Sequence, residues 1–324
     1  MRAIVQDAYG PPEVLELRDV ERPQPGDNDV LVRVRAASAN PYDWHFMRGI
    51  PYFMRAASGL RRPKNTVLGS DVAGRVEEVG CGASRFRPGD EVIGFVGAGG
   101  FAEHVAVPEE HLGLKPETLT FEQASAVPLA GLTALQGLRD AGGLEQGQSV
   151  LIIGAGGGVG TFAVQIGRSL GAHVTGVCST TKLEMVRSLG ADHVIDYTGE
   201  DYLASGRRYD IVLQLAGTDG AGRLRRALTP RGTLVLSSGD ATGRWIAPMG
   251  RYLRARAMSP FVSQRLLGLS VKRSRADMEE LKMLIEAGEI SPVVGRTYPL
   301  SEATEAMAHL EEGHAAGKIV IDVD

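Results

Sequence analysis

The stretch SVLIIGAGGGVGTFAVQIGRSLGA, residues 149–172, decides the fold. It opens with SVLII, a mostly branched apolar run that is too short for a helix and typical of a strand buried on both faces of a parallel sheet. Glycines follow at once, and TFAVQIGRSL then has the spacing of a helix that ends at Gly171. A strand, a glycine-rich turn and a helix in this order predict a site for a dinucleotide.

The glycine spacing departs from the strict G-x-G-x-x-G fingerprint, because Val159 or Thr161 stands where its last glycine would fall. The related pattern G-x-x-G-x-x-G is met, and the physics is unchanged. Backbone without Cβ atoms can approach a pyrophosphate, and a helix start offers free N–H groups and partial positive charge. A Walker A loop is excluded because no Gly-Lys-Ser/Thr follows. The residues predicted to contact the cofactor here are Gly154, Gly157, Gly158, Val159 and Gly160.

The end of the second predicted strand distinguishes NADPH from NADH. An acidic residue there would hold the ribose hydroxyls of NAD, but this chain has VTGVCSTTK with no carboxylate. The hydroxyl of Ser179 and the ammonium of Lys182 suit a 2′-phosphate, so NADPH is the expected cofactor. The alternative is a solvated helix start with Ser179 or Thr180 as its N-cap.

Outward from this turn, strands alternate with helices through GTLVLSS, which predicts a doubly wound parallel sheet. Residues 1–119 instead show short strands divided by turn residues, the pattern of a β-rich, partly barrel-like domain. FEQASAVPLAGLTALQGL is expected to be helical between the two regions. After about residue 270, two helices precede a last strand, GKIVIDV.

Composition limits the classes of protein to consider. The chain has 324 residues, enough for two domains, with a net charge of −4 that gives no reason to expect nucleic acid as a partner. Two cysteines cannot form a disulfide framework or a thiolate zinc cluster, and they suit a reducing cytoplasm. The first residues lack the apolar core of a signal peptide, and no apolar run of about 18 residues predicts a transmembrane segment.

Several further motifs extend along the whole chain: ASANPYDWHFMRG, LGSDVAGRVEEVG, FRPGDEVIG, GGFAEHVAVP, AVPLAGLTALQGL and SLGADHVIDY. With the glycine loop, this series resembles the zinc-free quinone oxidoreductase-like branch of the medium-chain dehydrogenase/reductase superfamily. The resemblance implies an α/β fold in which a GroES-like β-barrel catalytic domain, residues 1–122 and 270–324, encloses a Rossmann domain, residues 123–269. It also implies an active site in the cleft between the domains.

Zinc-dependent members of the superfamily carry Cys where Asn40 stands, and a His-Glu pair where Ser70 and Asp71 stand. An amide and a hydroxyl are poor zinc ligands, so no zinc is expected. Without a Lewis acid, oxidation of simple alcohols loses its activator, whereas reduction of a polarised acceptor needs only hydrogen-bond donors.

The resemblance also assigns individual residues. Asn40 would face the nicotinamide and the substrate, and Lys182, Tyr197 and Ser179 would meet the 2′-phosphate. The other cofactor positions it implies are Thr133, Gly217, Ser238, Phe261 and Val262.

Candidate catalytic groups beside Asn40 are Asp43, to anchor structure or to orient a substrate donor, and Tyr52, to donate to a carbonyl oxygen. We expect the cleft wall to be formed by Tyr42, Trp44, His45 and Phe46.

The expected function is NADPH-dependent, zinc-independent transfer of hydride to a quinone or an α,β-unsaturated carbonyl, in a homodimer. The alternatives are an NAD(P)-dependent alcohol or aldehyde oxidoreductase and a non-catalytic NADPH-binding sensor or structural protein. Residues 244–275 carry eight basic residues and no acid. They predict a solvated helix face with a dimer contact, or else peripheral contact with an anionic membrane, while binding of nucleic acid is a third interpretation.

Overall fold

The structure, a computed structural model, describes residues 1–237 and 247–324. The chain forms two compact units. The first comprises residues 1–129, 273–287 and 292–324, and the second comprises 130–272 and 288–291. Within the described ranges, no helix has the length and apolar character needed to cross a membrane.

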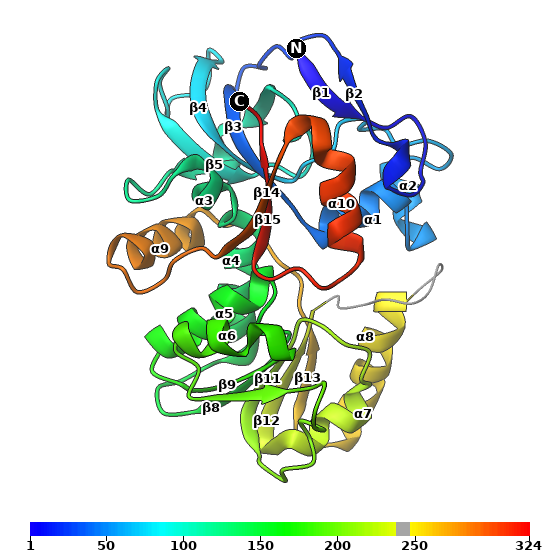
Figure 1. Cartoon of the computed structure of the whole chain (residues 1–324), viewed down its shortest axis with the longest axis vertical. Helices are drawn as coiled ribbons and strands as arrows, with labels where there is room; N and C mark the ends of the chain where they lie inside the picture. Colours follow the sequence, from blue (N-terminus) through cyan, green and yellow to red (C-terminus); the bar gives the residue numbers. More distant parts are fainter. Residues whose placement is uncertain (238–246) are drawn as a thin grey trace. The chain divides into compact units, whose positions relative to one another are not determined.

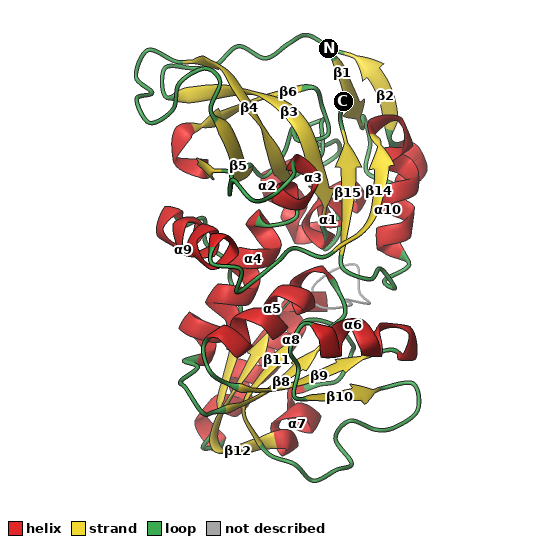
Figure 2. Cartoon of the chain, turned by 60° about the vertical axis from the view of Figure 1, so that its left-hand side comes forward, coloured by secondary structure: helices red, strands yellow, loops and turns green. Residues whose placement is uncertain are grey.

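The second unit is built on a six-stranded parallel sheet in the order β10-β9-β8-β11-β12-β13. Counted along the chain from β8, this is the 3-2-1-4-5-6 order of a Rossmann domain. The strands are β8 (Ser149–Ile153), β9 (His173–Cys178), β10 (His193–Asp196), β11 (Tyr209–Gln214), β12 (Leu228–Leu236) and β13 (Arg265–Gly268). β8 is buried from Val150 to Ile153, because helices cover both faces of the sheet (Figure 2).

Helices α5 and α6 lie on one face of this sheet, and α7 and α8 on the other (Figures 1 and 2). The helical segments of the unit are α4 (Pro128–Leu135, its first two residues in the first unit), the π-helical η4 (Gln136–Gly142), α5 (Gly158–Ser169), η5 (Thr180–Lys182), α6 (Leu183–Ser188), α7 (Ala221–Leu224), η6 (Arg225–Ala227), α8 (Ala247–Met258) and η7 (Ser259–Phe261). The core between sheet and α8 includes Leu151, Val212, Leu234 and Leu266.

The first unit contains a seven-stranded sheet in the order β14-β15-β3-β4-β5-β7, with β6 also paired to β3. All pairs are antiparallel except β14 with β15. Its strands are β3 (Asp29–Ala39), β4 (Asp71–Val79), β5 (Glu91–Phe95), β6 (His104–Pro108), β7 (Leu112–Leu114), β14 (Val294–Pro299) and β15 (Lys318–Asp322). A separate ribbon pairs β1 (Arg2–Val5) with β2 (Glu16–Asp19).

The helical segments of the first unit are η1 (Pro12–Val14), α1 (Pro41–Arg48), η2 (Tyr52–Met54), α2 (Arg55–Ser58), η3 (Glu109–His111), α3 (Phe121–Ser125), α9 (Arg275–Glu286), η8 (Leu300–Glu302) and α10 (Ala303–Glu311). The core of this unit joins α10, through Ala306 and Met307, to the strands, through Val32, Val72 and Ile319. The long strand β3 is hydrogen-bonded to β4, β6 and β15. Helix α1 begins two residues after β3 ends, so the sheet fixes the position of the start of α1.

The predicted α/β class with a doubly wound sheet is confirmed. The single helical stretch predicted over 121–138 is divided instead, since α3 ends at Ser125 and α4 begins at Pro128. Proline lacks an N–H for a helix interior but fits a first turn. Two strands were not predicted: β13 has only four residues within a basic run, and β14 is largely exposed, so neither shows the alternation that marks a strand.

Candidate active site

The glycine-rich turn between β8 and α5 leaves no room for side chains. Gly154 has a φ of 92°, in the left-handed region, and its N–H donates to the Val177 carbonyl at 3.1 Å. A Cβ at Gly160 would lie 2.1 Å from the Gly154 oxygen, which is backbone and cannot move aside. The turn therefore presents bare backbone, as close approach of a phosphate requires.

The start of α5 is open to an anion. Gly157 is the N-cap, and no side chain caps the helix. The Thr161 N–H, the first in the helix to donate, bonds to the Gly157 carbonyl at 3.0 Å. The N–H groups of Gly158, Val159 and Gly160 come before it and have no acceptor among the described residues. Three free N–H groups and the positive end of the helix dipole fit the pyrophosphate of a dinucleotide.

Three of the predicted phosphate-binding residues gather where β9 and β10 end. The stem of Lys182 packs on the bare Cα of Gly156, because a Cβ there would lie 2.6 Å from the lysine Cδ. Ser179 follows Cys178, the last residue of β9, and the Tyr197 N–H donates to the Cys178 carbonyl at 3.1 Å. Partial burial lowers the pKa of Lys182. The glycine turn, a hydroxyl and an ammonium thus occur together.

A carboxylate that the sequence analysis missed lies beside these residues. Asp196, the last residue of β10, pairs in register with Cys178. Its side chain accepts hydrogen bonds from the hydroxyls of Thr180 at 2.5 Å and Thr198 at 2.7 Å, and from the Thr198 N–H at 2.9 Å. These bonds lower the pKa of Asp196 and leave it ionised at neutral pH. The dinucleotide-binding motif expects an acidic residue at the end of the second strand, whereas Asp196 ends the third strand, β10.

The other predicted cofactor residues are more scattered. Gly217 follows β11 beside Ala216, which lies against Gly154, and its carbonyl accepts from Gln214 Nε2 at 3.2 Å. Arg251 of α8, not predicted as a site residue, also donates to the Gly217 carbonyl at 3.2 Å.

Thr133 is buried in α4, whereas Phe261 in η7 is 88% exposed beside half-buried Val262. Ser238 lies outside the described residues. In the basic run, Arg254 and Arg256 are exposed on α8, and residues 244–246 are not described.

In the first unit, Asn40 is the centre of a buried polar cluster. Asn40 follows the last residue of β3 and is the N-cap of α1, and the residue is 3% exposed. Its Nδ2 donates to the Ser38 carbonyl at 3.1 Å, to Ser70 Oγ at 3.1 Å and to Asp71 Oδ2 at 3.0 Å. Its Oδ1 accepts from the ammonium of Lys318 at 2.6 Å. Both polar atoms of the amide are thus used within the cluster.

Two carboxyls share this cluster. Asp43 Oδ2 accepts from the Asn40 N–H at 2.9 Å, closing a capping box, and from Ser70 Oγ at 3.0 Å. Burial, and then the charge of Asp71, raise the pKa of Asp43 to about 7. Burial raises the pKa of Asp71 to about 6, against the opposing effect of Lys318. Asp43 is therefore an acid that can hold a proton at neutral pH.

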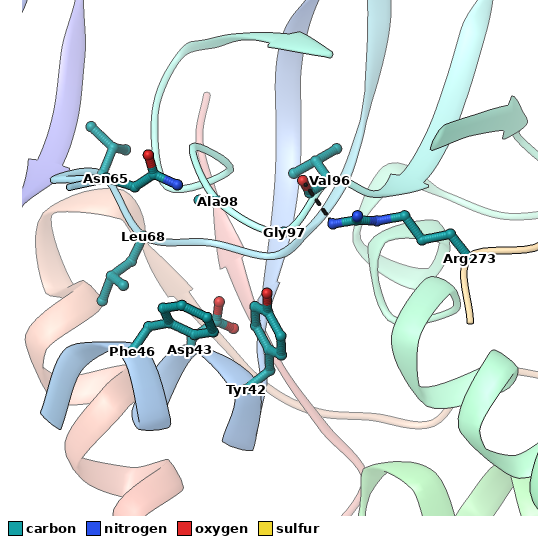
Figure 3. Close-up of a pocket in the computed structure, with 10 residues that line it drawn as sticks. Tyr42, Asp43, Phe46, Asn65, Leu68, Val96, Gly97, Ala98 and Arg273 are labelled. Carbon is teal, nitrogen blue, oxygen red and sulfur yellow. Dashed lines mark hydrogen bonds between the residues drawn. The ribbon is translucent and has the colours of Figure 1, made fainter. Parts of the chain in front are cut away.

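A pocket of about 220 Å³ opens in the first unit beside this cluster (Figure 3). Figure 3 shows Tyr42 and Phe46 of α1 side by side below it, with Asp43 between them. The lining residues are Tyr42, Asp43, Phe46, Asn65, Val67, Leu68, Val96, Gly97, Ala98 and Arg273. The pocket combines aromatic and aliphatic walls with a few polar groups, the usual composition of a site for a small organic ligand.

Not all of the predicted wall lies in this lining. Tyr42 and Phe46 do, but Trp44 Nε1 donates to Glu311 at 2.8 Å, and His45 Nδ1 bonds the Ile50 carbonyl at 2.8 Å. Tyr52, the predicted donor, lies in η2, with the guanidinium of Arg55 4.6 Å from its ring centroid. Asp43 is thus the candidate catalytic side chain that faces the pocket.

The positions that correspond to zinc ligands hold hydrogen-bonded residues. Asn40 donates to both Ser70 and Asp71, and Lys318 Nζ lies 2.6 Å from the Asn40 oxygen. Nowhere in residues 1–237 and 247–324 do three or more His, Cys, Asp or Glu side chains gather as metal ligands would. An ammonium at the centre of the cluster opposes a second cation there.

Two protein families match parts of this chain. The alcohol dehydrogenase GroES-like domain matches residues 26–117, and the zinc-binding dehydrogenase family matches residues 189–321.

Full-length relatives match as well. The chain is 35% identical to a mitochondrial NAD(P)H oxidoreductase of Mus musculus, over all of this chain and 89% of the relative. The structure of a quinone oxidoreductase from Coxiella burnetii is 32% identical, with a TM-score of 0.89 over 100% of this chain and 99% of that one. A mycobacterial protein complexed with NADPH is 27% identical, with a TM-score of 0.83 over the whole of both chains.

Proposed function

The chain is an oxidoreductase of the medium-chain dehydrogenase/reductase superfamily, quinone oxidoreductase-like, and we propose that it uses NADPH, without zinc, to reduce a quinone or an α,β-unsaturated carbonyl. The observation that carries the proposal is the contact between Asn40 and Lys318. Lys318 Nζ lies 2.6 Å from the oxygen of Asn40, the residue that stands where zinc-dependent members of the superfamily carry a cysteine ligand. Activation of an alcohol by a metal is therefore disfavoured, and an acceptor that is already polarised is favoured.

The choice of NADPH rests on the ends of β9 and β10. Lys182 supplies a positive charge beside the glycine turn, and Ser179 and Tyr197 supply hydroxyls. Asp196 is occupied by two threonine hydroxyls and one amide, which leaves less of its acceptor capacity for a ribose hydroxyl. Hydrogen-bond donors and an ammonium together favour a 2′-phosphate over a bare ribose.

When bound, the nicotinamide supplies the hydride. The chain's own residues have to place the acceptor, exclude water and deliver a proton to the oxygen that becomes negative. The apolar wall of Phe46 and Leu68 can hold the carbon frame of the acceptor. Asp43, with Oδ2 engaged and a pKa of about 7, can supply the proton from Oδ1, which has no hydrogen bond among the described residues.

Initial rates test this proposal. Oxidation of NADPH and NADH would be followed with a single-ring quinone, a short enone and an enal, with and without a chelator, and alcohol oxidation would be run in parallel. We expect NADPH consumption that the chelator leaves unchanged. Chelator-sensitive alcohol oxidation would contradict the proposal. Cofactor binding without turnover of any acceptor would favour the non-catalytic alternative.

Lys182→Met provides the test of cofactor choice. Loss of one charge-assisted hydrogen bond should raise the KM for NADPH by about tenfold while the KM for NADH changes little. Lys64→Met, at an exposed lysine of the other unit, is the matched control. If Lys182→Met changed the KM for NADPH and the KM for NADH equally, Lys182 would have a structural role only.

The compartment and the oligomeric state remain predictions. Cys81 and Cys178 are both free thiols, which supports a reducing compartment such as the cytoplasm. A homodimer is the commonest assembly among soluble oligomers, and size-exclusion chromatography with light scattering would test it.

A further inference from the structure

One wall of the pocket brings two hydrogen-bond donors to the same point. Arg273 Nη2 lies 2.5 Å, and the Tyr42 hydroxyl 3.9 Å, from where a Cβ of Gly97 would stand. Gly97 has a φ of 91°, so the chain turns here without a side chain and leaves this space to the two donors. Figure 3 shows Tyr42 rising toward Gly97 from below, with Arg273 reaching it from the side.

Arg273 is held in place by hydrogen bonds to backbone carbonyls, and several of its N–H groups remain available to a ligand. Its Nε donates to the Phe95 carbonyl at 2.9 Å and its Nη2 to the Val96 carbonyl at 3.3 Å. The guanidinium also lies over the Phe95 ring, 4.7 Å from the centroid. In the part of the chain that the structure describes, no carboxylate pairs with Arg273. The two N–H groups on Nη1 and one on Nη2 thus have no acceptor among the described residues.

The Tyr42 hydroxyl is available in the same way. Its ring packs on Phe46, with centroids 4.7 Å apart, and against the edge of Phe95 at 5.3 Å. Its oxygen makes no hydrogen bond to any described residue. Burial raises the pKa of Tyr42, so the phenol keeps its proton and acts as a donor. The third polar group at the rim, the amide of Asn65, can donate as well.

This donor arrangement selects for negative charge. The one acid in the lining is Asp43, whose pKa of about 7 leaves it partly neutral at physiological pH. The pocket volume of about 220 Å³ is below the usual range for organic ligands, roughly 300–1,000 Å³, so the ligand has to be compact. A guanidinium with free N–H groups binds carboxylate better than it binds a neutral carbonyl.

We propose that the acceptor is a small enone or enal that carries a carboxylate, which Arg273 and Tyr42 bind while Phe46 and Leu68 contact its carbon frame. The inference rests on the proposed reductase function and names its substrate class. It concerns recognition of the acceptor, and the hydride and proton steps stay as described above. A solely structural Arg273, one that only ties its segment to the end of β5, would not distinguish an acid from its ester.

The experiment compares 6-oxohept-4-enoate with its methyl ester. Two methylene groups separate the carboxyl group from the enone, so the two compounds share one enone and differ in charge. We expect kcat/KM for the acid to exceed that for the ester by about fivefold, as suits an ion pair that is partly exposed. In Arg273→Met the ratio of acid to ester should fall to about one, mainly because the KM for the acid rises. Tyr42→Phe should lower the ratio by less. Arg275→Met deletes an exposed arginine two residues away, and it controls for the loss of one positive charge.

The outcomes separate the two proposals. Turnover of both compounds with no preference for the acid, or an unchanged ratio in Arg273→Met, would overturn the inference and leave the reductase standing. A higher KM for NADPH with the same ratio would assign Arg273 to the cofactor, which also overturns it. If nothing is reduced, the proposed function fails. Calorimetry with 6-oxoheptanoate and its methyl ester then tests the recognition of the carboxylate alone, because acid-selective binding that Arg273→Met abolishes supports it and equal binding refutes it.

Discussion

Asp43→Asn should change how the stability of the first unit depends on pH. A carboxyl whose pKa is higher in the folded than in the unfolded chain binds its proton more tightly when folded. The free energy of unfolding therefore falls as pH rises between the two values. With an ordinary value of 3.8 and a folded value of about 7, Asp43 alone removes on the order of 2–3 kcal/mol between about pH 5 and pH 8. Asparagine keeps the acceptor oxygen for Asn40 and Ser70 but cannot ionise.

Urea unfolding of the variant and the parent at both pH values measures this difference. Trp44, bonded to Glu311 within the first unit, reports on that unit, provided Trp245 is replaced by Phe in both proteins. The asparagine variant should gain stability relative to its parent as pH rises, by about the amount given above. Asp19→Asn, at an exposed position on β2, is the control and should show no such gain. Parallel pH profiles for parent and Asp43→Asn would refute the reasoning.

Two further substitutions test the glycine turn and the polar cluster. Gly160→Ala places a Cβ 2.1 Å from the Gly154 oxygen, and it should cost about 1–3 kcal/mol of stability and weaken NADPH binding. In Gly157→Ala the nearest atom is 3.5 Å away, so thermal unfolding should differ little from the parent, and equal losses in both would contradict the steric argument. Lys318→Met removes a buried ammonium whose charge acts on two buried acids, Asp71 and Asp43, and should destabilise the first unit by about 3–5 kcal/mol in denaturant titrations near neutral pH. A cost below about 1 kcal/mol would show that Lys318 does not compensate these acids.

Local sequence identified the parts of the site that depend on neighbours in the chain. The glycine turn could be predicted because strand, turn and helix are consecutive, and the same holds for Lys182 and Ser179 just after β9. Asp43 could be proposed as a candidate because it follows β3 by only a few residues. The strongly raised pKa of Asp43 could not be predicted, since it depends on burial and on the charge of Asp71, 28 residues later in the chain.

The remaining residues were missed because tertiary pairing brings them into place. Asp196 reaches Cys178 only through the parallel register of β10 with β9, and Lys318 reaches Asn40 only because β15 pairs with β3. For Lys318 a signal was available in the sequence. Lys318 opens a strand that is otherwise apolar, and a lone lysine in a buried strand calls for a partner. Arg273 gave no such signal, because it stands among other basic residues.

The place of β15 in the sheet has a consequence for how the chain is made. β15 is hydrogen-bonded between β3 and β14, and its first residue, Lys318, completes the cluster around Asn40. During synthesis, every strand of the second unit emerges before β15, so that unit can fold while the first still lacks an interior strand. Until then Asn40, Asp43 and Asp71 have no cation beside them, and β3 presents a free edge that another nascent chain could pair with. The unit whose synthesis starts first is therefore finished last, and chaperone protection should matter most for β3.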